Sequence, residues 1–293
     1  MRNPRLLKIF PKHFLLIQVV ALLLMPIVSP GICPAGGGSG FWTDNQANLG
    51  QTPEQKEWDV KLGAGLRVGP RYEGSDFYTP SPVPYFNVNW RDIVSLGVGG
   101  LNVNFLPGRN YQFGVGLTYN PGRDEKGDSF FGTGLFGTDD RLVGLGDIDA
   151  ALGVRVFGAY KLGPVAFHGS LVKYTGDQND GILFNLGMGV PFHPTPNLIL
   201  TPGIGATWAT DSYMQTFFGV TAQQASRTAF PTFNAEGGLK DVTAGLNATY
   251  LLDRHWFIST DAGIKRLMGD ADKSPITESG TSATVGSVVG YHF

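Results

Sequence analysis

Two polar side chains near the middle of the sequence have the types and the spacing that nucleophilic catalysis can use. His168 and Ser170 lie two residues apart in the stretch FHGS. On a β-strand they would share one face, where a histidine can take the proton of a serine hydroxyl. The alternative is that both line a polar interior. No carboxylate that could orient the histidine can be assigned from the sequence, so we favour the second interpretation and expect no catalytic residue.

The sequence contains no convincing motif for binding a cofactor or a metal. The stretch GTGLFG, residues 132–137, matches the glycine spacing of dinucleotide-binding loops, but no strand pattern precedes it and no helix pattern follows it. The five histidines form no metal-binding motif. We therefore expect no cofactor and no metal. The net charge of −2 also argues against a nucleic-acid partner.

The first 35 residues differ in composition from the rest of the chain. Basic residues precede an apolar stretch from Phe14 to Val28, and small and turn-forming residues follow it. This order predicts a secretory signal peptide over residues 1–35. A single transmembrane helix is the alternative, but the stretch is short and Pro26 interrupts it. Cys33 is the only cysteine, so the mature chain would form no disulfide.

After the signal peptide the sequence changes from a polar segment to an alternating one. Residues 36–57 are polar and rich in glycine and glutamine, which predicts a flexible periplasmic tail. From Trp58 onward the dominant pattern has a period of two. In WDVKLGAGLRV, Trp58 and every second residue after it are apolar, whereas Asp59 and every second residue after it are polar or glycine. Such alternation is typical of β-strands with two unlike faces.

Both a soluble β-sandwich and a membrane β-barrel have alternating strands, but three features favour the barrel. Many of the runs are long, whereas strands of soluble proteins usually have about five or six residues. The second face is rich in glycine, of which there are 42, and only 16 % of all residues are charged, which suits a polar lumen. Aromatic residues lie at the ends of the apolar faces, as they do in the aromatic girdles of barrels at the two bilayer interfaces. They are Trp58, Tyr119, Tyr160, Trp208, Tyr250, Trp256 and Tyr291.

The lengths of the connections predict how many strands cross the membrane. Counted back from Phe293, long and short connections alternate, as in barrels with long outer loops and short periplasmic turns. Both termini would then lie in the periplasm, and the strand number would be even. A hairpin at Val98-Gly99-Gly100-Leu101 would divide residues 92–106 into two strands. We therefore predict an all-β, transmembrane, antiparallel up-and-down β-barrel of about twelve strands over residues 58–293, with about ten as the alternative.

Charged residues on the second face are expected to point into the lumen, where opposite charges pair and narrow it. A selectivity lining is the alternative to this filled interior. The residues are Asp59, Lys61, Arg67, Asp149, Arg155, Asp241, Asp261 and Lys265. A second group of acidic residues gathers in one long loop, where we prefer a solvated loop to cation-bridged contact with lipopolysaccharide. These are Asp124, Glu125, Asp128, Asp139 and Asp140.

The chain ends in SATVGSVVGYHF, an amphipathic strand whose last residue is aromatic. In a closed barrel the last strand must pair with the first, so this end is not expected to fray. Val289, Tyr291 and Phe293 would face lipid at the periplasmic rim. A terminal strand of this form resembles the assembly signal by which the barrel-assembly machinery recognises its substrates. We therefore expect the protein in the outer membrane of a Gram-negative bacterium, in contact with lipid and lipopolysaccharide.

Several stretches of the alternating region resemble the MipA/OmpV family of outer-membrane proteins. They are RYEGSD (71–76), YMQTFFGV (213–220), GGLKDV (237–242), GDADKSPIT (269–277) and the closing YHF. The last long loop is among the most specific parts, with Gly269, Asp270, Ser274 and Pro275. Lys273 departs from the family pattern, which more often has a small residue at that position.

The resemblance implies an outer-membrane barrel without known catalytic residues or cofactors. The branch that gives the family its name is a scaffold that links a lytic transglycosylase to a peptidoglycan synthase, and other members are adhesins or antigens. A murein hydrolase or synthase is therefore the expected partner. Three alternatives stay open: a small-solute channel, an adhesin or antigen, and a lipid A-modifying enzyme. The last rests on His168 and Ser170, whose spacing is similar to that in outer-membrane lipid A deacylases.

Overall fold

A computed structural model describes residues 57–106, 108, 110–126, 140–176 and 180–293 of the chain. The predicted signal peptide, the predicted tail except for residue 57, and the GTGLFG stretch lie outside the described residues. Among the helices of the described residues, none is long and apolar enough to cross a bilayer.

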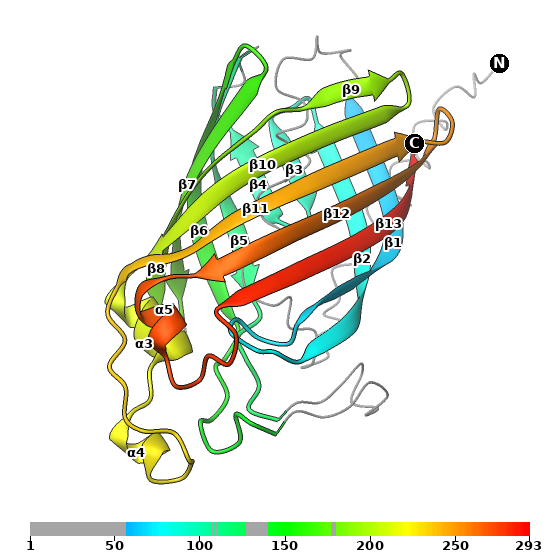
Figure 1. The fold of residues 1–293 in the computed structure, drawn as a ribbon. Helices are drawn as coiled ribbons and strands as arrows, with labels where there is room; N and C mark the ends of the chain where they lie inside the picture. Colours follow the sequence, from blue (N-terminus) through cyan, green and yellow to red (C-terminus); the bar gives the residue numbers. More distant parts are fainter. Residues whose placement is uncertain (1–56, 107, 109, 127–139, 177–179) are drawn as a thin grey trace, which may run out of the picture.

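The described chain consists mainly of antiparallel strands, with three short helices between the later strands (Figure 1). The first strands are β1 (Trp58–Pro70), β2 (Tyr78–Trp90), β3 (Val94–Gly97), β4 (Gly100–Asn104), β5 (Tyr111–Asn120), β6 (Ala151–Leu162) and β7 (Val165–Thr175). The later strands are β8 (Gly181–Gly189), β9 (Phe192–Thr195), β10 (Leu198–Ala209), β11 (Gly238–Leu251), β12 (Trp256–Leu267) and β13 (Thr281–His292). The helices are α3 (Asp211–Phe218), α4 (Ala222–Ala225) and α5 (Gly269–Lys273).

The strands form a closed barrel wall. Pairing of β1 with β13 joins the two ends of the strand region, and pairing of β10 with β11 completes the circuit. The short strand β9 pairs only with β10 and is not a separate strand of the wall. The 13-stranded sheet therefore contains a wall of twelve strands, since β9 is subtracted. The prediction of a twelve-stranded up-and-down barrel is confirmed.

The hairpin predicted within residues 92–106 is present, one residue earlier than the Gly-Gly pair suggested. A two-residue turn, Val98-Gly99, lies between the paired residues Gly97 and Gly100. Gly100 has a φ of +108°, and a Cβ at this position would lie 2.0 Å from the carbonyl oxygen of Leu117. Glycine is needed here because it accepts this backbone angle and leaves room for β5.

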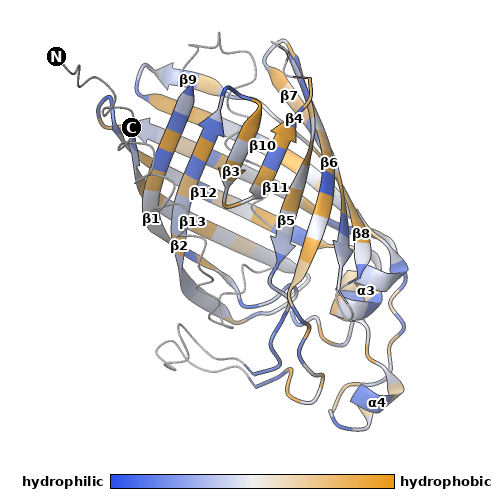
Figure 2. Cartoon of the chain, turned by 180° about the vertical axis from the view of Figure 1, so that it is seen from behind, coloured by the Kyte–Doolittle hydropathy of each residue, from blue (hydrophilic) through white to orange (hydrophobic). Residues whose placement is uncertain are grey.

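The two faces of the wall differ as the alternation predicts. Apolar side chains point outward, and Leu66 of β1 and Leu152 of β6 are more than 60 % exposed. Polar side chains point inward, and Asn87 of β2 and Asn102 of β4 are buried. Figure 2 shows the alternation as hydrophilic and hydrophobic bands along the strands. Six of the predicted girdle aromatics are exposed on the outer face: Trp58, Tyr119, Tyr160, Trp208, Tyr250 and Trp256.

The connections are short at one end of the barrel and long at the other. The C-terminus and the start of β1 lie at the end with the short turns, which we call the terminus end (Figure 1). The opposite end carries α3, α4 and α5, and we call it the loop end. The alternation of connection lengths is therefore confirmed. By the same reasoning, the terminus end is predicted to face the periplasm.

The seam between β1 and β13 holds the C-terminus in place. A Cβ at Gly65 of β1 would lie 2.0 Å from the carbonyl oxygen of Ser287 in β13, so glycine permits the close approach of the two backbones. Phe293 donates its N–H to the carbonyl oxygen of Val60 at 2.9 Å. The expectation that the last strand pairs with the first is thus confirmed.

Candidate functional site: the cap at the loop end

At the loop end of the barrel, helices pack onto inward-facing side chains of the wall. Tyr213 and Met214 of α3 are buried, and they share one core with Tyr174 of β7 and Ala271 of α5. Figure 1 shows α3 and α5 side by side at this end of the barrel. We call α3, residues 269–277 (α5 and the segment after it) and residues 71–77 the cap, because they cover the inner face of the strands at this end.

Long-range hydrogen bonds hold the parts of the cap together. The Ser274 hydroxyl, just after α5, donates to the carbonyl oxygen of Phe218 at the end of α3, at 2.5 Å. The Tyr72 hydroxyl donates to the carbonyl oxygen of Ile276 at 3.4 Å. Both carbonyl-bearing residues are almost completely buried. Three loops that are distant in the sequence therefore form one packed unit.

Four charged side chains form a buried cluster where the cap meets the wall. Glu73 accepts hydrogen bonds from Lys240 at 2.7 and 2.9 Å and from Lys265 at 2.6 Å. Lys240 also forms an ion pair with Asp241 at 2.8 Å. None of the four side chains is more than 11 % exposed. We call these residues the charge cluster. Its two cations balance its two carboxylates, which is the condition under which buried charges are tolerated.

A β-bulge brings Lys240 into the charge cluster. β11 pairs regularly with β10 up to Asp241 and Thr207, but Trp208 pairs with Leu239, so Lys240 has no residue opposite it. A bulge of this kind re-aims a side chain. As a result, the consecutive residues Lys240 and Asp241 are both 1 % exposed. In a regular strand they would face opposite sides, which is why a period of two predicts only one of them in the lumen.

The charge cluster controls the ionisation of Glu73. Burial alone would raise the pKa of this carboxyl group, but Lys240 and Lys265 outweigh burial and hold the pKa below its usual value. A carboxylate with a lowered pKa stabilises the folded state above its unfolded pKa of about 4.3. That stabilisation is lost as the pH falls through the lower, folded value.

We therefore expect the cap to loosen in acid. Hydrogen exchange of the α3 amides, corrected for the intrinsic pH dependence of exchange, should show lost protection below about pH 4. The Glu73→Gln variant should show a smaller change over the same range, because one titrating carboxyl is gone and Asp241 remains. Equal protection of α3 at about pH 6 and about pH 3 in the wild type would show that Glu73 does not stabilise the cap.

The four predicted residues of the family-motif loop all belong to the cap. Gly269 begins α5 with a φ of +55°, which glycine adopts without strain. Asp270 accepts the N–H of Glu236 at 3.0 Å and thereby ties α5 to the segment before β11. Ser274 is buried, and Pro275 beside it is partly buried. The contacts of these residues shape the cap.

The four internal stretches that resemble the family meet at this site. RYEGSD supplies Glu73, YMQTFFGV forms most of α3, GGLKDV supplies Lys240 and Asp241, and GDADKSPIT forms α5. The contact of Tyr72 with Ile276 spans 204 positions of the sequence. The residues that carry the resemblance are therefore neighbours in space.

The remaining charges of the lumen pair mostly with groups close to them. At the terminus end, Asp59 lies 3.6 Å from the Lys61 ammonium and 2.7 Å from Nε2 of His292. Farther along the lumen, Arg67 and Asp261 attract each other electrostatically. These contacts agree with the expectation of paired charges that narrow the interior.

Two other charged residues are also predicted to line the lumen, and only one of them does. Arg155 points inward and donates to the side chain of Asn102. Asp149 does not line the lumen: it is exposed and precedes β6, which begins at Ala151. The physical reason is that β5, the partner of β6, ends at Asn120 just before a proline, which cannot donate to the ladder.

The acidic loop before β6 is tied to its own backbone. The Glu125 carboxylate accepts the N–H groups of Gly144 at 2.9 Å and Gly146 at 3.0 Å, and these bonds lower its pKa. This residue therefore has a structural role in the loop. Asp128 and Asp139 lie outside the described residues.

Ser170 points into the lumen, as the alternation predicts. Its hydroxyl accepts a hydrogen bond from the Asn185 side chain at 3.2 Å, and Asn185 in turn accepts one from Thr207 at 3.1 Å. His168 has the same parity on β7 and pairs across the strands with Gly187. Within the described residues, no group of three or more potential metal ligands is clustered. Ser170 thus belongs to a polar network of the interior.

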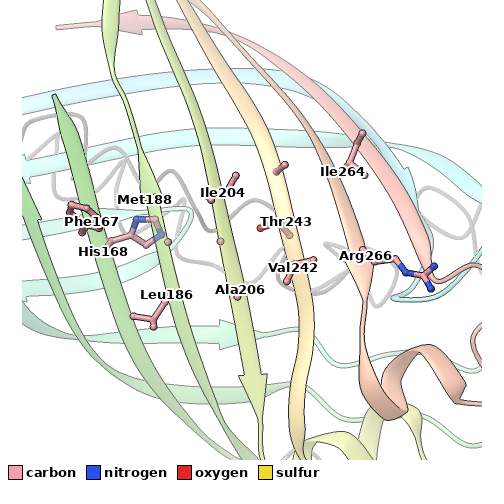
Figure 3. A pocket seen from close by; sticks show the side chains of 13 residues that line it. Phe167, His168, Leu186, Met188, Ile204, Ala206, Val242, Thr243, Ile264 and Arg266 are labelled. Carbon is pink, nitrogen blue, oxygen red and sulfur yellow. The ribbon is translucent and has the colours of Figure 1, made fainter.

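A pocket of about 770 Å³ lies against β7, β8, β10, β11 and β12 (Figure 3). Most of its lining consists of apolar side chains, such as Phe167 and Ile204, and small residues, such as Gly205, leave the space. His168 and Arg266 lie at opposite sides of it in Figure 3. Ser170 is not among the lining residues. The pocket therefore does not bring the histidine and the serine together over one substrate position.

The family of the chain follows from its sequence as a whole. The family model described as MltA-interacting protein MipA matches residues 62–293, more than half of the chain. The chain belongs to the MipA family. The predicted family is confirmed, and with its closed wall this MipA-family barrel is a protein of the outer membrane.

Solved structures that are similar to the MipA-family barrel share little sequence with it. OmpT of Vibrio cholerae is 8 % identical, with a TM-score of 0.39 over 83 % of this chain and 100 % of that one. DcaP of Acinetobacter baumannii is 10 % identical, with a TM-score of 0.35 over 84 % and 100 %. OprD of Pseudomonas aeruginosa is 13 % identical, with a TM-score of 0.34 over 83 % and 67 %. No curated protein sequence matches the chain.

The predicted assembly residues of the MipA-family barrel lie on the outer face of β13 and just beyond it. Val289 and Phe293 are exposed, at 47 % and 64 %. The ring of Tyr291 packs edge-on against Trp256 at 5.1 Å and against Phe293 at 4.8 Å. An aromatic patch therefore marks the terminus end of the seam, and its recognition by the assembly machinery stays a prediction.

Proposed function

We propose that this MipA-family barrel is a non-enzymatic scaffold of the cell envelope that binds a murein hydrolase or synthase in the periplasm. The observation that carries the proposal is the cap. A buried core and a neutral charge cluster occupy part of the lumen at the loop end, which supports an anchor over an open pore. The family description, an interacting protein, supports a protein partner. The hydrogen bond that Asn185 donates to Ser170 supports a role without catalysis.

The terminus end offers an edge at which a periplasmic partner can bind. β9 pairs with β10 on one side and has no strand partner on its other side among the described residues. All of its residues are exposed, including Phe192 at 44 %. An exposed strand edge can accept a strand from another protein, and an exposed aromatic side chain adds apolar contact. We therefore place the partner contact at β9.

Co-purification from detergent extracts tests the proposal. Wild-type protein should retain a murein hydrolase or synthase, identified by mass spectrometry. The Phe192→Asp variant should retain several-fold less, because it puts a charge into the proposed contact. The Lys273→Glu variant is the matched control, since it places the same kind of charge on an exposed residue of the loop end. Equal losses in both variants would remove β9 as the contact, and a wild type that retains no murein enzyme would refute the scaffold role.

A further inference from the structure

Within the described residues, one stretch of the barrel wall has no strand pairing between the two strands that flank it, β2 and β5. β3 pairs with β2 only at Asn87–Trp90, and β4 pairs with β5 only at Gly114–Leu117. Beyond the β3–β4 turn, residues 78–84 of β2 pair with β1 alone among the described strands, and residues 118–120 of β5 pair with β6 alone. We call this interruption the β2–β5 break. At the turn, β2 and β5 are three strand spacings apart, or about 14 Å.

The β2–β5 break is bounded on all sides and lies in the loop-end half of the wall. The β3–β4 turn closes it toward the terminus end. Toward the loop end, Arg71 donates to the carbonyl oxygen of Lys126 at 3.4 Å, and Arg141 donates to Asp76 at 2.7 Å. These contacts connect the loop after β1 with the loop after β5. Within the described residues the break is therefore an enclosed interruption of the strand pairing, which we call the window.

The edge of β2 along the window carries three prolines at alternate positions. Pro80, Pro82 and Pro84 are the cross-strand partners of Val68, Leu66 and Ala64 in β1. Proline has no N–H, so these must be the non-hydrogen-bonded pairs of the β1–β2 ladder, and their backbone groups point toward the window. Three donors that an ordinary edge strand would expose are consequently absent. Unsatisfied N–H groups are costly in a bilayer, so this edge suits a strand that stays unpaired there.

The window joins an apolar outer surface to a polar interior. The proline rings share the outward face with Leu66, and the outward side chains across the window, Leu117 and Tyr119, are about half exposed. Val98 at the hairpin tip is 61 % exposed. On the inward face, Ser81 of β2 is the cross-strand partner of Arg67. A molecule in the window would thus contact lipid-facing apolar groups and lumen-facing polar groups at once.

We propose that the β2–β5 window admits a single-chain membrane amphiphile from the bilayer, with its hydrocarbon chain between β2 and β5 and its polar headgroup toward the lumen. A hydrocarbon chain needs no hydrogen bonds from the strand edge. Addition of a peptide strand, the other occupant that an edge can take, requires alternating donors and acceptors. Pro80, Pro82 and Pro84 remove those donors, whereas their carbonyl groups remain as acceptors for headgroup hydroxyls or water. This proposal does not depend on the scaffold role.

Photo-crosslinking in proteoliposomes tests the window. A benzophenone amino acid is placed at Ser81, which faces the lumen beside the window, or at Ser259, which faces the lumen on the fully paired strand β12. The probe is a lysophospholipid with an alkyne on its acyl chain. We expect at least about five-fold more probe at Ser81 than at Ser259. Heat-modifiable mobility on gels confirms that each variant is folded, and Thr79, on the same face of β2, replaces Ser81 if that variant does not fold.

Each other result overturns the proposal. Equal labelling at the two positions would show that the probe reaches the lumen from its ends and not through the window. Absence of labelling at both Ser81 and Thr79 would show that the window is closed to lipid. Irradiation of the Ser81 variant in native outer membranes should give an adduct with the mass of a lipid. A polypeptide adduct in its place would identify strand addition as the function of this edge.

Discussion

Replacement of Lys240 by methionine should open the cap. The change removes one cation from the neutral charge cluster and leaves Glu73 and Asp241 buried with only Lys265 to balance them. Loss of one partner of a buried ion pair typically costs about 3–5 kcal/mol. Because the strands of the wall keep their own pairing, we expect this cost to release the cap and not to unfold the barrel. Chymotrypsin should then cut α3, whose Tyr213 and Phe218 are buried in the wild type.

Conductance in planar bilayers gives a second measurement of the same prediction. Wild-type protein should show no steady ion conductance, and the Lys240→Met variant should show one. Lys273→Met is the control, because this lysine is 71 % exposed and contributes little to stability. Addition of Glu73→Gln to Lys240→Met restores neutrality and should recover part of the protease resistance. A steady wild-type conductance would favour the small-solute channel, and a protected Lys240→Met variant would remove the charge cluster as the support of the cap.

Deletion of Phe293 should reduce the amount of folded barrel in the outer membrane several-fold. The residue is 64 % exposed, so its loss removes little packing, and stability should change by about 0.5 kcal/mol or less. The expected defect is therefore one of recognition and rate. Pulse-labelled protein should accumulate in the periplasm and be degraded, while the fraction that folds should unfold at the same temperature as the wild type.

An aromatic residue elsewhere in the girdle provides the control for this deletion. Tyr160 is 52 % exposed on the outer face near the terminus end, and Tyr160→Ala should assemble in normal amounts. A comparable loss in both variants would indicate a general need for interfacial aromatics. Normal amounts of heat-modifiable barrel without Phe293 would contradict the assembly-signal interpretation.

The wall could be predicted from the sequence because a barrel strand repeats one simple rule. Leu66 and Arg67 differ in environment only because successive side chains face opposite sides of the sheet, and this rule holds along most strands. Glycine pairs and short polar connections then mark the turns. The alternating lengths of the connections predict an even number of strands. A hairpin within residues 92–106 also follows from this count, but its turn is Val98-Gly99 and not the predicted Gly99-Gly100 pair.

The cap could not be predicted in the same way, because its contacts break that rule. The bulge at Lys240 turns two consecutive residues inward, and no period in the sequence marks it. Glu73 lies in a loop, so alternation says nothing about its direction. Two signals for the helices were present: Tyr213, Met214 and Phe217 have helical spacing, and Thr221 with Gln224 forms a capping box before α4.

The distances along the chain between members of the charge cluster determine the order in which the protein can fold. Lys240 and Lys265 are 167 and 192 positions from Glu73, so these contacts give the cap a high contact order. Contacts of this kind form late, because the intervening chain must first be ordered. The intervening chain here is most of the wall, including β2 to β10. The cap therefore completes only in a barrel whose strands are already in register, and protection of α3 becomes a marker that separates finished barrels from assembly intermediates.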